Sequence, residues 1–472
     1  MGRRAHLPTS WPNVWEDDDV WKRIVALLLA ITVGGYLFAD AWDLVPGPLT
    51  TKPALPEPLP YPTLSQVTAH APEPDEQVSP TAANPPSPTG VAALISALAN
   101  AENNTGKASV IVADPLTGKT IASYNPDRPT IPASNMKIVT ARAALDVLGP
   151  ENTLPTVVAA QGSTLYLVGG GDVLFAEGAG DPRATRGRAG LADLAGAVVD
   201  KLSGSVTQVN LVVDSSLFEG PQYFTDIEGV DRGYVMELRP LAVDRGRVQG
   251  RGYLPNPDLL AGEAFAEHLR AAGLGVGEVK RGTVANDAVE LARVESAPVR
   301  ELVDLLLTES DNSLSEVMGH LVAKAKGKPA TFAGSAAAIG EVMAAAGYPM
   351  KGVTLGDASG LSRLNRVTAE LLTAILLDTW KCQECRFAAL PAGLPVSALN
   401  GTLTQRFGGT AVAGQARAKT GTLVEAISLS GYLRTEAGYP LVFSIMLDEL
   451  EPGTAPSSRT LIDTLVTGLA KL

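Results

Sequence analysis

The sequence predicts an α+β protein in which an antiparallel sheet is combined with several helices. Near the C-terminus, extended segments separated by a Glu-Ala-Gly turn are typical of an antiparallel meander, and they cover residues 416–428, 431–434 and 439–447. Apolar patterns of helical period occur in the central part of the chain, at residues 134–148, 299–307 and 314–323.

The N-terminal part reads as a membrane segment followed by a linker. Residues 24–39 are apolar, two basic residues precede them and a tryptophan flanks each side, as in a helix that obeys the positive-inside rule. Sixteen apolar residues are short for a span, and Ala39-Asp40-Ala41 also fits a cleaved export signal. The acidic segment before them favours an uncleaved anchor. We assign residues 1–23 to a short cytoplasmic N-terminus, 24–41 to the anchor or signal, and 42–88 to a proline-rich linker.

Three short motifs occur in order along the chain and together indicate one chemistry. They are Ser134-Asn135-Met136-Lys137, Ser310-Asp311-Asn312 and Lys419-Thr420-Gly421-Thr422. Each is weak alone, but the first is distinctive here because no other serine in the chain has a lysine three positions later. The combination is typical of β-lactamases and penicillin-binding proteins.

Ser134 and Lys137 have the spacing of a nucleophile and its base. Residues three apart on a helix have Cβ atoms about 5–6 Å apart on one face. Burial in the apolar helix at 134–148, together with the positive end of that helix, is expected to lower the pKa of Lys137, as a general base requires. The alternative is that Ser134 only caps the helix while Lys137 extends to solvent.

The second and third motifs supply polar groups for a cleft. The motif at 310–312 lies between two helical patterns, so we expect a tight junction between two helices. Such a junction can point Ser310 and Asn312 into the cleft. An ordinary helix cap is the alternative. Lys419 and its threonines offer a cation and two hydroxyls at a strand edge, which suits a C-terminal carboxylate, and Gly421 leaves room for substrate near the backbone. A polar strand end facing water is the alternative.

From about residue 89 to the C-terminus the chain resembles the low-molecular-mass class C penicillin-binding proteins, the D-alanyl-D-alanine carboxypeptidase/endopeptidase family. Besides the motifs, the resembling segments are PASN at 132–135, LYLVGGGD at 165–172, VVDSS at 212–216, DASGLSR at 357–363 and GTL at 401–403. The resemblance implies a serine β-lactamase/transpeptidase-like fold, an antiparallel sheet covered by helices, with an inserted accessory domain. The family usually has glycine where this chain has Ala358, and alanine would strain the loop if that position needs a positive φ.

The spacing of the motifs also predicts an insert. Ser310 lies 176 positions after Ser134, much more than a helix and a loop require. We expect a discontinuous catalytic domain formed by residues 89–153 and 294–472, with the accessory region at 154–293 between them.

The resemblance implies a serine-type D-Ala-D-Ala carboxypeptidase or endopeptidase, outside the cytoplasm, that acts on peptidoglycan stem peptides and is inhibited covalently by β-lactams. The implied roles are acylated nucleophile for Ser134, base for Lys137, proton relay to the leaving amine for Ser310, partner of the lysine and the substrate amide for Asn312, carboxylate binding for Lys419, Thr420 and Thr422, and oxyanion binding for the N–H groups of Ser134 and Thr422. A β-lactamase or esterase and a non-catalytic muropeptide-binding scaffold are the alternative functions.

Arg363, between the second and third motifs, is a candidate for substrate specificity. Stem peptides with a diamino acid carry a side-chain carboxylate, which a fixed guanidinium would bind through two hydrogen bonds. A structural ion pair with an acidic residue is the alternative.

Other chemistries have little support in the sequence. His268 and His320 lie in helical patterns, the other two histidines precede the globular part, and there is no G-x-S-x-G motif. Cys382 and Cys385 lack further ligands for a zinc site, so we favour a structural role and leave a disulfide open. A net charge of −12 argues against a nucleic-acid partner. We therefore expect neither a metal nor a cofactor.

Overall fold

The computed structural model describes residues 18–41, 45, 48, 84–202, 204, 206–227, 229–248, 252–382 and 385–472. The chain divides into two compact units, residues 1–78 and 79–472. The predicted cytoplasmic N-terminus up to residue 17 and most of the predicted linker at 42–88 lie outside the described residues.

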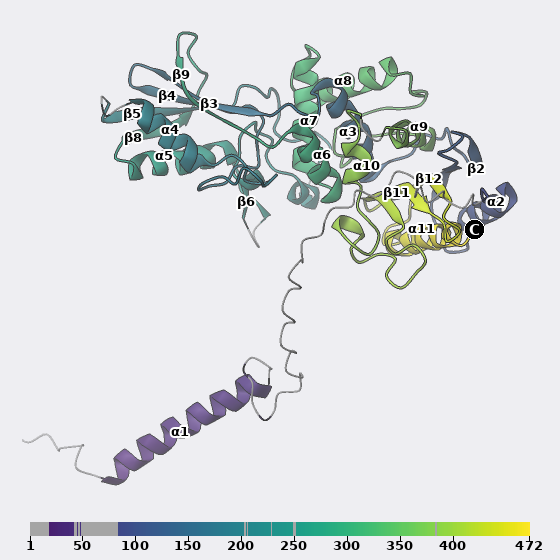
Figure 1. The fold of residues 1–472 in the computed structure, drawn as a ribbon, viewed down its shortest axis with the longest axis horizontal. Coiled ribbons are helices and arrows are strands. Elements are labelled where there is room, and N and C mark those ends of the chain that lie inside the picture. Colours follow the sequence, from purple (N-terminus) through teal and green to yellow (C-terminus); the bar gives the residue numbers. More distant parts are fainter. Residues whose placement is uncertain are drawn as a thin grey trace, which may run out of the picture. The chain divides into compact units, whose positions relative to one another are not determined.

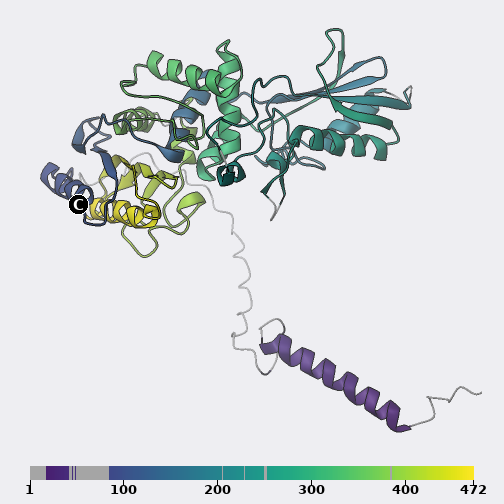
Figure 2. The same cartoon turned by 180° about the vertical axis from the view of Figure 1, so that it is seen from behind.

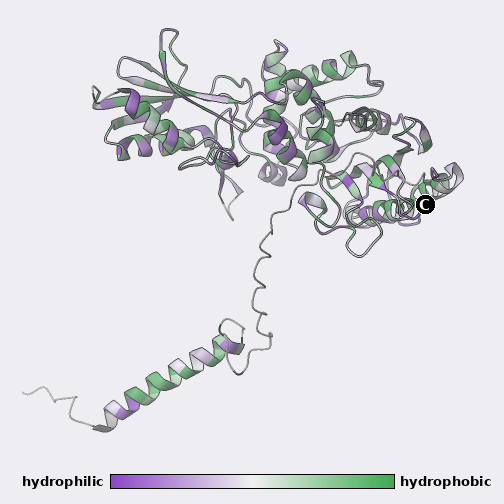
Figure 3. Ribbon diagram, in the orientation of Figure 1, coloured by the Kyte–Doolittle hydropathy of each residue, from purple (hydrophilic) through white to green (hydrophobic). Residues whose placement is uncertain are grey.

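The first unit contains one described helix, α1 (Asp18–Ala41), which is apolar between charged residues near its two ends. Its segment Trp21–Ala41 has a mean hydropathy of 2.0 and is long and apolar enough to cross a membrane. The large apolar side chains of this helix, such as Leu27 and Phe38, are exposed, and Figure 3 shows hydrophobic colour through the middle of α1 and hydrophilic colour near its ends. The helix has 24 residues, about 36 Å at 1.5 Å per residue, so it is longer than the apolar run suggested.

The first sheet of the second unit has the strand order β10-β11-β12-β1-β2, with antiparallel neighbours throughout. Its strands are β1 (Lys107–Ala113), β2 (Thr120–Tyr124), β10 (Ala416–Thr422), β11 (Ala426–Arg434) and β12 (Pro440–Asp448). The single extended segment predicted at 416–428 is wrong, because the chain turns at residues 423–425. This turn, Leu-Val-Glu, contains neither glycine nor proline and is closed by a bond from Leu423 N to Ala426 O of 2.8 Å.

Helices cover both faces of this sheet. Val110 and Val112 of β1 pack in a core with α2 (Pro88–Ala99) and α11 (Ala455–Ala470), whereas Ile111 packs in the core on the other face. Successive side chains of a strand point to opposite faces, and helices cover both faces of this sheet. The strands β11 and β12 are therefore buried along almost their whole length. Figure 1 shows α2 and α11 side by side near the C-terminus, where they are in contact.

The other face carries the helices that position the site. They are η1 (Ala133–Asn135), α3 (Met136–Val147), α6 (Val299–Thr308), α7 (Asn312–Ala325), α8 (Phe332–Ala345), α9 (Ala369–Trp380) and α10 (Ala389–Gly393). The short turn η4 (Gly401–Leu403) belongs to the face of α2 and α11, because Leu403 packs in their core. The helix predicted at 134–148 is thus a short 3-10 turn followed by α3. The helix predicted from 314 begins at Asn312, because the carboxylate of Asp311 accepts from Leu314 N at 2.9 Å and caps it.

Residues 154–293, predicted to be an insert, contain most of a second sheet with the order β8-β5-β4-β3-β9. Its strands are β3 (Pro155–Gln161), β4 (Thr164–Val168), β5 (Gln208–Asp214), β8 (Gly275–Arg281) and β9 (Val289–Glu295). The pairs β4–β5 and β5–β8 are parallel. Figures 1 and 2 show α4 (Leu191–Leu202) and α5 (Pro257–Ala271) along one face, where they share a core with the sheet. The remaining elements are η2 (Gly229–Tyr234), η3 (Asp244–Gly246), β6 (Arg247–Val248) and β7 (Gly252–Tyr253).

The histidines of the globular part and the cysteines have structural surroundings. His268 and His320 lie in α5 and α7, and burial lowers the pKa of His320 to about 4. Its ring is in contact with the ring of Phe332, with the centroids 4.9 Å apart. Cys382 and Cys385 pair as a disulfide directly after α9, with their Cα atoms 5.3 Å apart.

Candidate active site

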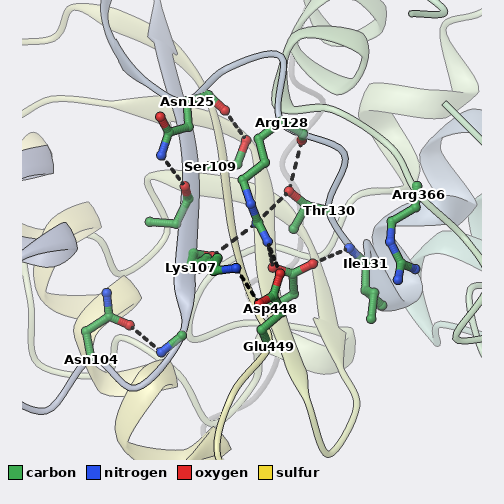
Figure 4. A network of polar contacts seen from close by, with 12 residues as sticks. Asn104, Lys107, Ser109, Asn125, Arg128, Thr130, Ile131, Arg366, Asp448 and Glu449 are labelled. Atoms are coloured by element: carbon green, nitrogen blue, oxygen red, sulfur yellow. Dashed lines mark hydrogen bonds and ion pairs between the residues drawn. The ribbon is translucent and has the colours of Figure 1, made fainter. Parts of the chain in front are cut away.

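Ser134 lies on a strained turn that the first sheet holds in place. Ala133, just before it, has a φ of 46°, a left-handed conformation that is costly for alanine. The segment leading into the turn is tied to the end of β12, as Figure 4 shows. Ile131 N donates to Asp448 at 2.9 Å, and Arg128 forms an ion pair of 2.6 Å with the same carboxylate. These contacts fix the Ser134 hydroxyl in front of α3.

Two glycines allow other segments to pack against this turn. A Cβ on Gly360, whose φ is 87°, would lie 1.9 Å from Ala133 O. A Cβ on Gly421 would lie 2.1 Å from Ser428 Oγ and 2.8 Å from Pro132 O. The side of Gly421 on which a Cβ would lie is therefore filled by the turn before Ser134 and by β11. Gly421 thus allows β10 to approach the turn, and its role as a substrate-binding residue stays a prediction.

Lys137 is fully buried, and its amine forms three hydrogen bonds within the site. Its Nζ donates to Ser134 Oγ at 3.1 Å, to Asn312 Oδ1 at 2.6 Å and to Ser359 O at 2.6 Å. Burial lowers the pKa of Lys137 to about 8, although nearby carboxylates, Asp357 first among them, oppose the shift. A neutral amine that can accept the serine proton is therefore accessible near neutral pH.

Two buried carboxylates lie behind the lysine. Glu316 accepts from the backbone N–H of Ser359 at 2.8 Å and of Ala358 at 3.2 Å. Burial, and then the charge of Asp357, raise the pKa of Glu316.

Ala358 does not have a positive φ, so the strain considered for this departure from the family pattern does not arise. The left-handed position in this loop belongs to Gly360 instead.

The second motif forms the junction between α6 and α7. Ser310 has a φ of 58° and lines the same cavity as Ser134. Asn312 accepts from the buried lysine, and its Nδ2 donates to Tyr234 O at 2.9 Å. Asp311 caps α7. The motif therefore combines both expected arrangements, because one residue caps a helix while its neighbours face the site.

The third motif lies on β10, where its threonines and its lysine have different surroundings. Thr420 and Thr422 line the cavity, and Thr420 Oγ1 donates to Thr402 Oγ1 at 2.8 Å. Lys419 is fully buried, and its Nζ donates to Thr420 O at 2.9 Å. Burial, and then the charge of Lys137, hold the pKa of Lys419 well below its usual range. The hydroxyls of this strand are thus open to a ligand, while the lysine lies behind them.

The three motifs meet at one cavity of about 410 Å³. It is lined by Ser134, Ser310, Thr402, Gln405, Arg406, Thr420, Thr422 and Arg459. Of the other predicted residues, Lys137 and Lys419 are buried next to this lining, and Asn312 contacts the former. The structure therefore brings together residues that lie up to 288 positions apart, from Ser134 to Thr422.

Arg363 does not line this cavity. Its Nη1 lies 2.8 Å from Asp231 Oδ2 and its Nε lies 2.6 Å from Glu425 Oε1. These ion pairs correspond to the structural alternative for this residue. Because its side chain is still 39% exposed, contact with a ligand is sterically open.

Three residues of the insert hold the second motif and the residue that follows it, and none of the three carries a signal in the sequence. Tyr234 supplies the carbonyl that binds Asn312, and Met236 N donates to Ser313 Oγ at 2.9 Å. Arg245 pairs with Asp311, and both side chains are buried. Thr402 was also missed as a site residue, although it lies in one of the segments that resemble the family.

We expect Arg245→Met to destabilise the protein by about 3–5 kcal/mol, because the Asp311 carboxylate would remain buried without its partner. Urea unfolding measures this loss. The substitution Asp311→Asn keeps an oxygen that can accept from Leu314 N but removes the buried charge. The double variant, Arg245→Met with Asp311→Asn, should therefore be more stable than Arg245→Met alone. Equal stability of Arg245→Met and the wild type, or no recovery in the double variant, would contradict this assignment.

Comparison with known proteins relates this arrangement to characterised relatives. The chain is 33% identical over 408 residues to a carboxypeptidase of Mycobacterium tuberculosis, covering 83% of this chain and 86% of the relative. It is 31% identical over 462 residues to the carboxypeptidase DacB of Mycolicibacterium smegmatis, covering 94% of each. The crystal structure of penicillin-binding protein 4 from Haemophilus influenzae matches with a TM-score of 0.64 at 20% identity, over 80% of this chain and 98% of that one.

The fold of this structure is therefore that of penicillin-binding protein 4, and it consists of an antiparallel sheet between helices and a second sheet that follows α3 in the chain. Residues 91–256 and 253–469 match one peptidase family, whose range includes all three motifs. The chain belongs to the D-Ala-D-Ala carboxypeptidase 3 (S13) family.

Proposed function

We propose that this chain is a serine-type D-Ala-D-Ala carboxypeptidase and endopeptidase that cleaves peptidoglycan stem peptides through an acyl-enzyme on Ser134. The observation that carries the proposal is the buried Lys137 amine, 3.1 Å from Ser134 Oγ, with its pKa lowered to about 8. Family membership and the names of the two mycobacterial carboxypeptidases support the activity.

In the proposed acylation, neutral Lys137 accepts the proton of Ser134 while Oγ attacks the carbonyl carbon between the two D-alanines. The N–H groups of Ser134 and Thr422 hold the resulting oxyanion, and loss of one such donor typically costs about 10²–10³ in rate. The C–N bond then breaks as Ser310 relays a proton to the leaving amine. Water hydrolyses the ester, and the Ser134 hydroxyl is regenerated.

The polar groups around the cavity position the substrate in this proposal. Thr422 donates to the terminal carboxylate, and Thr420 does so once its hydroxyl turns from Thr402. The negative charge of the bound carboxylate raises the pKa of Lys419 again, so that the lysine is protonated when substrate is bound. Asn312 holds Lys137 through its Oδ1 at 2.6 Å, and the family resemblance implies that it also contacts the substrate amide.

Penicillin tests the proposal against the alternative functions. The H. influenzae penicillin-binding protein 4 was solved with a β-lactam bound, which supports β-lactams as inhibitors of this chain. A peptidase should retain a penicillin adduct for many minutes, whereas a β-lactamase would hydrolyse it rapidly. A muropeptide-binding scaffold would form no adduct.

The direct test of activity is incubation of the full chain with purified muropeptides, followed by mass analysis of the products. Loss of one alanine from pentapeptides shows carboxypeptidase action, and conversion of cross-linked dimers into monomers shows endopeptidase action. Unchanged masses for both substrates, with active protein verified by penicillin labelling, would reject the proposed substrates.

We propose that Arg363 also contacts the side-chain carboxylate of a diamino acid in the stem peptide. Arg363→Ala should then lower kcat/KM for peptides with the free carboxylate about tenfold relative to the same peptides amidated there. Arg363→Lys keeps the charge but cannot form two parallel hydrogen bonds to a carboxylate, so it should recover only part of the lost kcat/KM for the free-carboxylate peptides. A parallel loss on both peptides, or a lower Tm, would assign the residue to its pairs with Asp231 and Glu425 instead.

We propose that α1 anchors the enzyme in the membrane, with the catalytic part outside the cytoplasm. The length and apolar surface of the helix support this placement. A chain lacking residues 1–41 should move from the membrane fraction to the soluble fraction, and an unchanged distribution would reject the anchor. A mature protein that keeps its N-terminal segment would show an anchor, and a mature protein that has lost this segment would show a cleaved signal.

A further inference from the structure

The active-site cavity has a basic wall that none of the proposed catalytic roles uses. Arg406 and Arg459 line it beside Gln405, and no aspartate or glutamate is among the described residues that line it. The chain as a whole has a net charge of −12. A cleft lined by charges of one sign concentrates its field and attracts ligands of the opposite charge.

The two arginines have different surroundings. Arg406 forms an ion pair with Asp463 of α11, and its guanidinium lies 5.3 Å from the ring centroid of Phe407. Arg459 is exposed at the start of α11 and forms no salt bridge within the described part of the chain. Arg406 is thus a fixed cation that is partly neutralised, whereas Arg459 keeps its full charge for a ligand.

The basic wall shares its cavity with the groups that are proposed to act on the leaving part of the substrate, and Thr420, one of these, is hydrogen-bonded to Thr402 in the segment that also carries Arg406. Ser310, which is proposed to protonate the leaving amine, and Thr420, which is proposed to bind the leaving carboxylate, line the same cavity as the arginines. Arg363, proposed for the acyl part of the substrate, does not line it. The volume of about 410 Å³ falls in the range of sites for drug-sized ligands, more than one alanine requires.

We infer that Arg459, assisted by Arg406, binds a second carboxylate on the leaving group. This inference rests on the proposed function and refines it: the favoured leaving group is an acidic peptide rather than free D-alanine. Cross-linked stem peptides are substrates of this kind, because the amine that leaves belongs to a second peptide with carboxylates of its own. A guanidinium binds a carboxylate through two parallel charge-assisted hydrogen bonds.

The experiment compares three substrates that share the same acyl part. The first is a D-Ala-D-Ala peptide, the second is a cross-linked dimer with an acidic leaving peptide, and the third is that dimer amidated at every leaving-peptide carboxylate except the one beside the scissile bond. In Arg459→Gln, the ratio of kcat/KM for the acidic dimer to that for the D-Ala-D-Ala peptide should fall about tenfold. The ratio for the amidated dimer should not change.

Two further measurements separate a charge effect from a structural one. Arg459→Lys should recover part of the acidic-dimer ratio, and added salt should lower this ratio in the wild type but not in Arg459→Gln. Arg183→Gln is the matched control, because Arg183 is 92% exposed and does not line the cavity. It should keep the wild-type ratio.

The inference is overturned if Arg459→Gln keeps the wild-type ratio, if both dimers are cleaved equally well, or if the wild type cleaves no dimer. Release of D-alanine and penicillin labelling of Ser134 would continue in each of these cases, so the proposed acyl-enzyme and carboxypeptidase action would stand. A wild type that cleaves no dimer would in addition remove the proposed endopeptidase action. A wild-type chain that is never acylated at Ser134 would instead contradict the proposed function on which the inference rests.

Discussion

Ser134→Ala should abolish both penicillin labelling and the release of D-alanine, with a loss of at least about 10⁴-fold in kcat/KM. The reason is that Ser134 is the hydroxyl 3.1 Å from the buried amine of Lys137, so its removal leaves no group to form the ester. The measurement is labelling with a fluorescent penicillin together with a D-alanine release assay.

Ser163→Ala is a suitable control for this variant. Ser163 is exposed in the turn between β3 and β4 of the second sheet, away from the cavity lining. It should label and turn over as the wild type does. Undiminished labelling of Ser134→Ala, with its unfolding curve unchanged, would place the nucleophile on another residue.

Lys137→Ala should slow acylation by about 10²–10⁴-fold, the typical contribution of a general base. Lys137→Arg should not restore the rate, because a guanidinium is too basic to lose its proton at neutral pH. The rate of adduct formation with penicillin measures both variants. A near-normal rate in Lys137→Ala would reject the role of the lysine as base.

The pH dependence of acylation tests the same assignment without relying on a loss of function. Burial lowers the pKa of Lys137 to about 8, and only the deprotonated amine can accept the serine proton. The wild-type acylation rate should therefore rise with pH below about 8 and level off above it. A wild-type rate that falls with rising pH over this interval would contradict a lysine base.

Local features of the site could be predicted from the sequence, because they depend on spacing along one helix. The three-residue separation of Ser134 and Lys137 predicts their contact, and the structure shows it. The helical patterns at 299–307 and 314–323 correspond to α6 and α7, so the junction that carries Ser310 was also placed correctly. Residue types and helical period are sufficient for such features.

Features that depend on distant contacts could not be predicted in this way. Arg245 and Asp311 meet although they lie 66 positions apart, and no local pattern marks either one as a partner. The sequence predicts room for a substrate at Gly421, but only the packed structure shows that Ser428 and the Pro132 carbonyl fill the side on which a Cβ would lie. The turn at 423–425 escaped prediction because its apolar residues continue the pattern of the strands.

The most direct test of the proposed acyl-enzyme is to locate it. The full chain is incubated with benzylpenicillin, digested, and analysed by mass spectrometry for a peptide that carries the penicilloyl group. The proposed chemistry predicts one adduct, an ester on the hydroxyl of Ser134. An adduct on any other residue, or no adduct on protein that releases D-alanine, would contradict it.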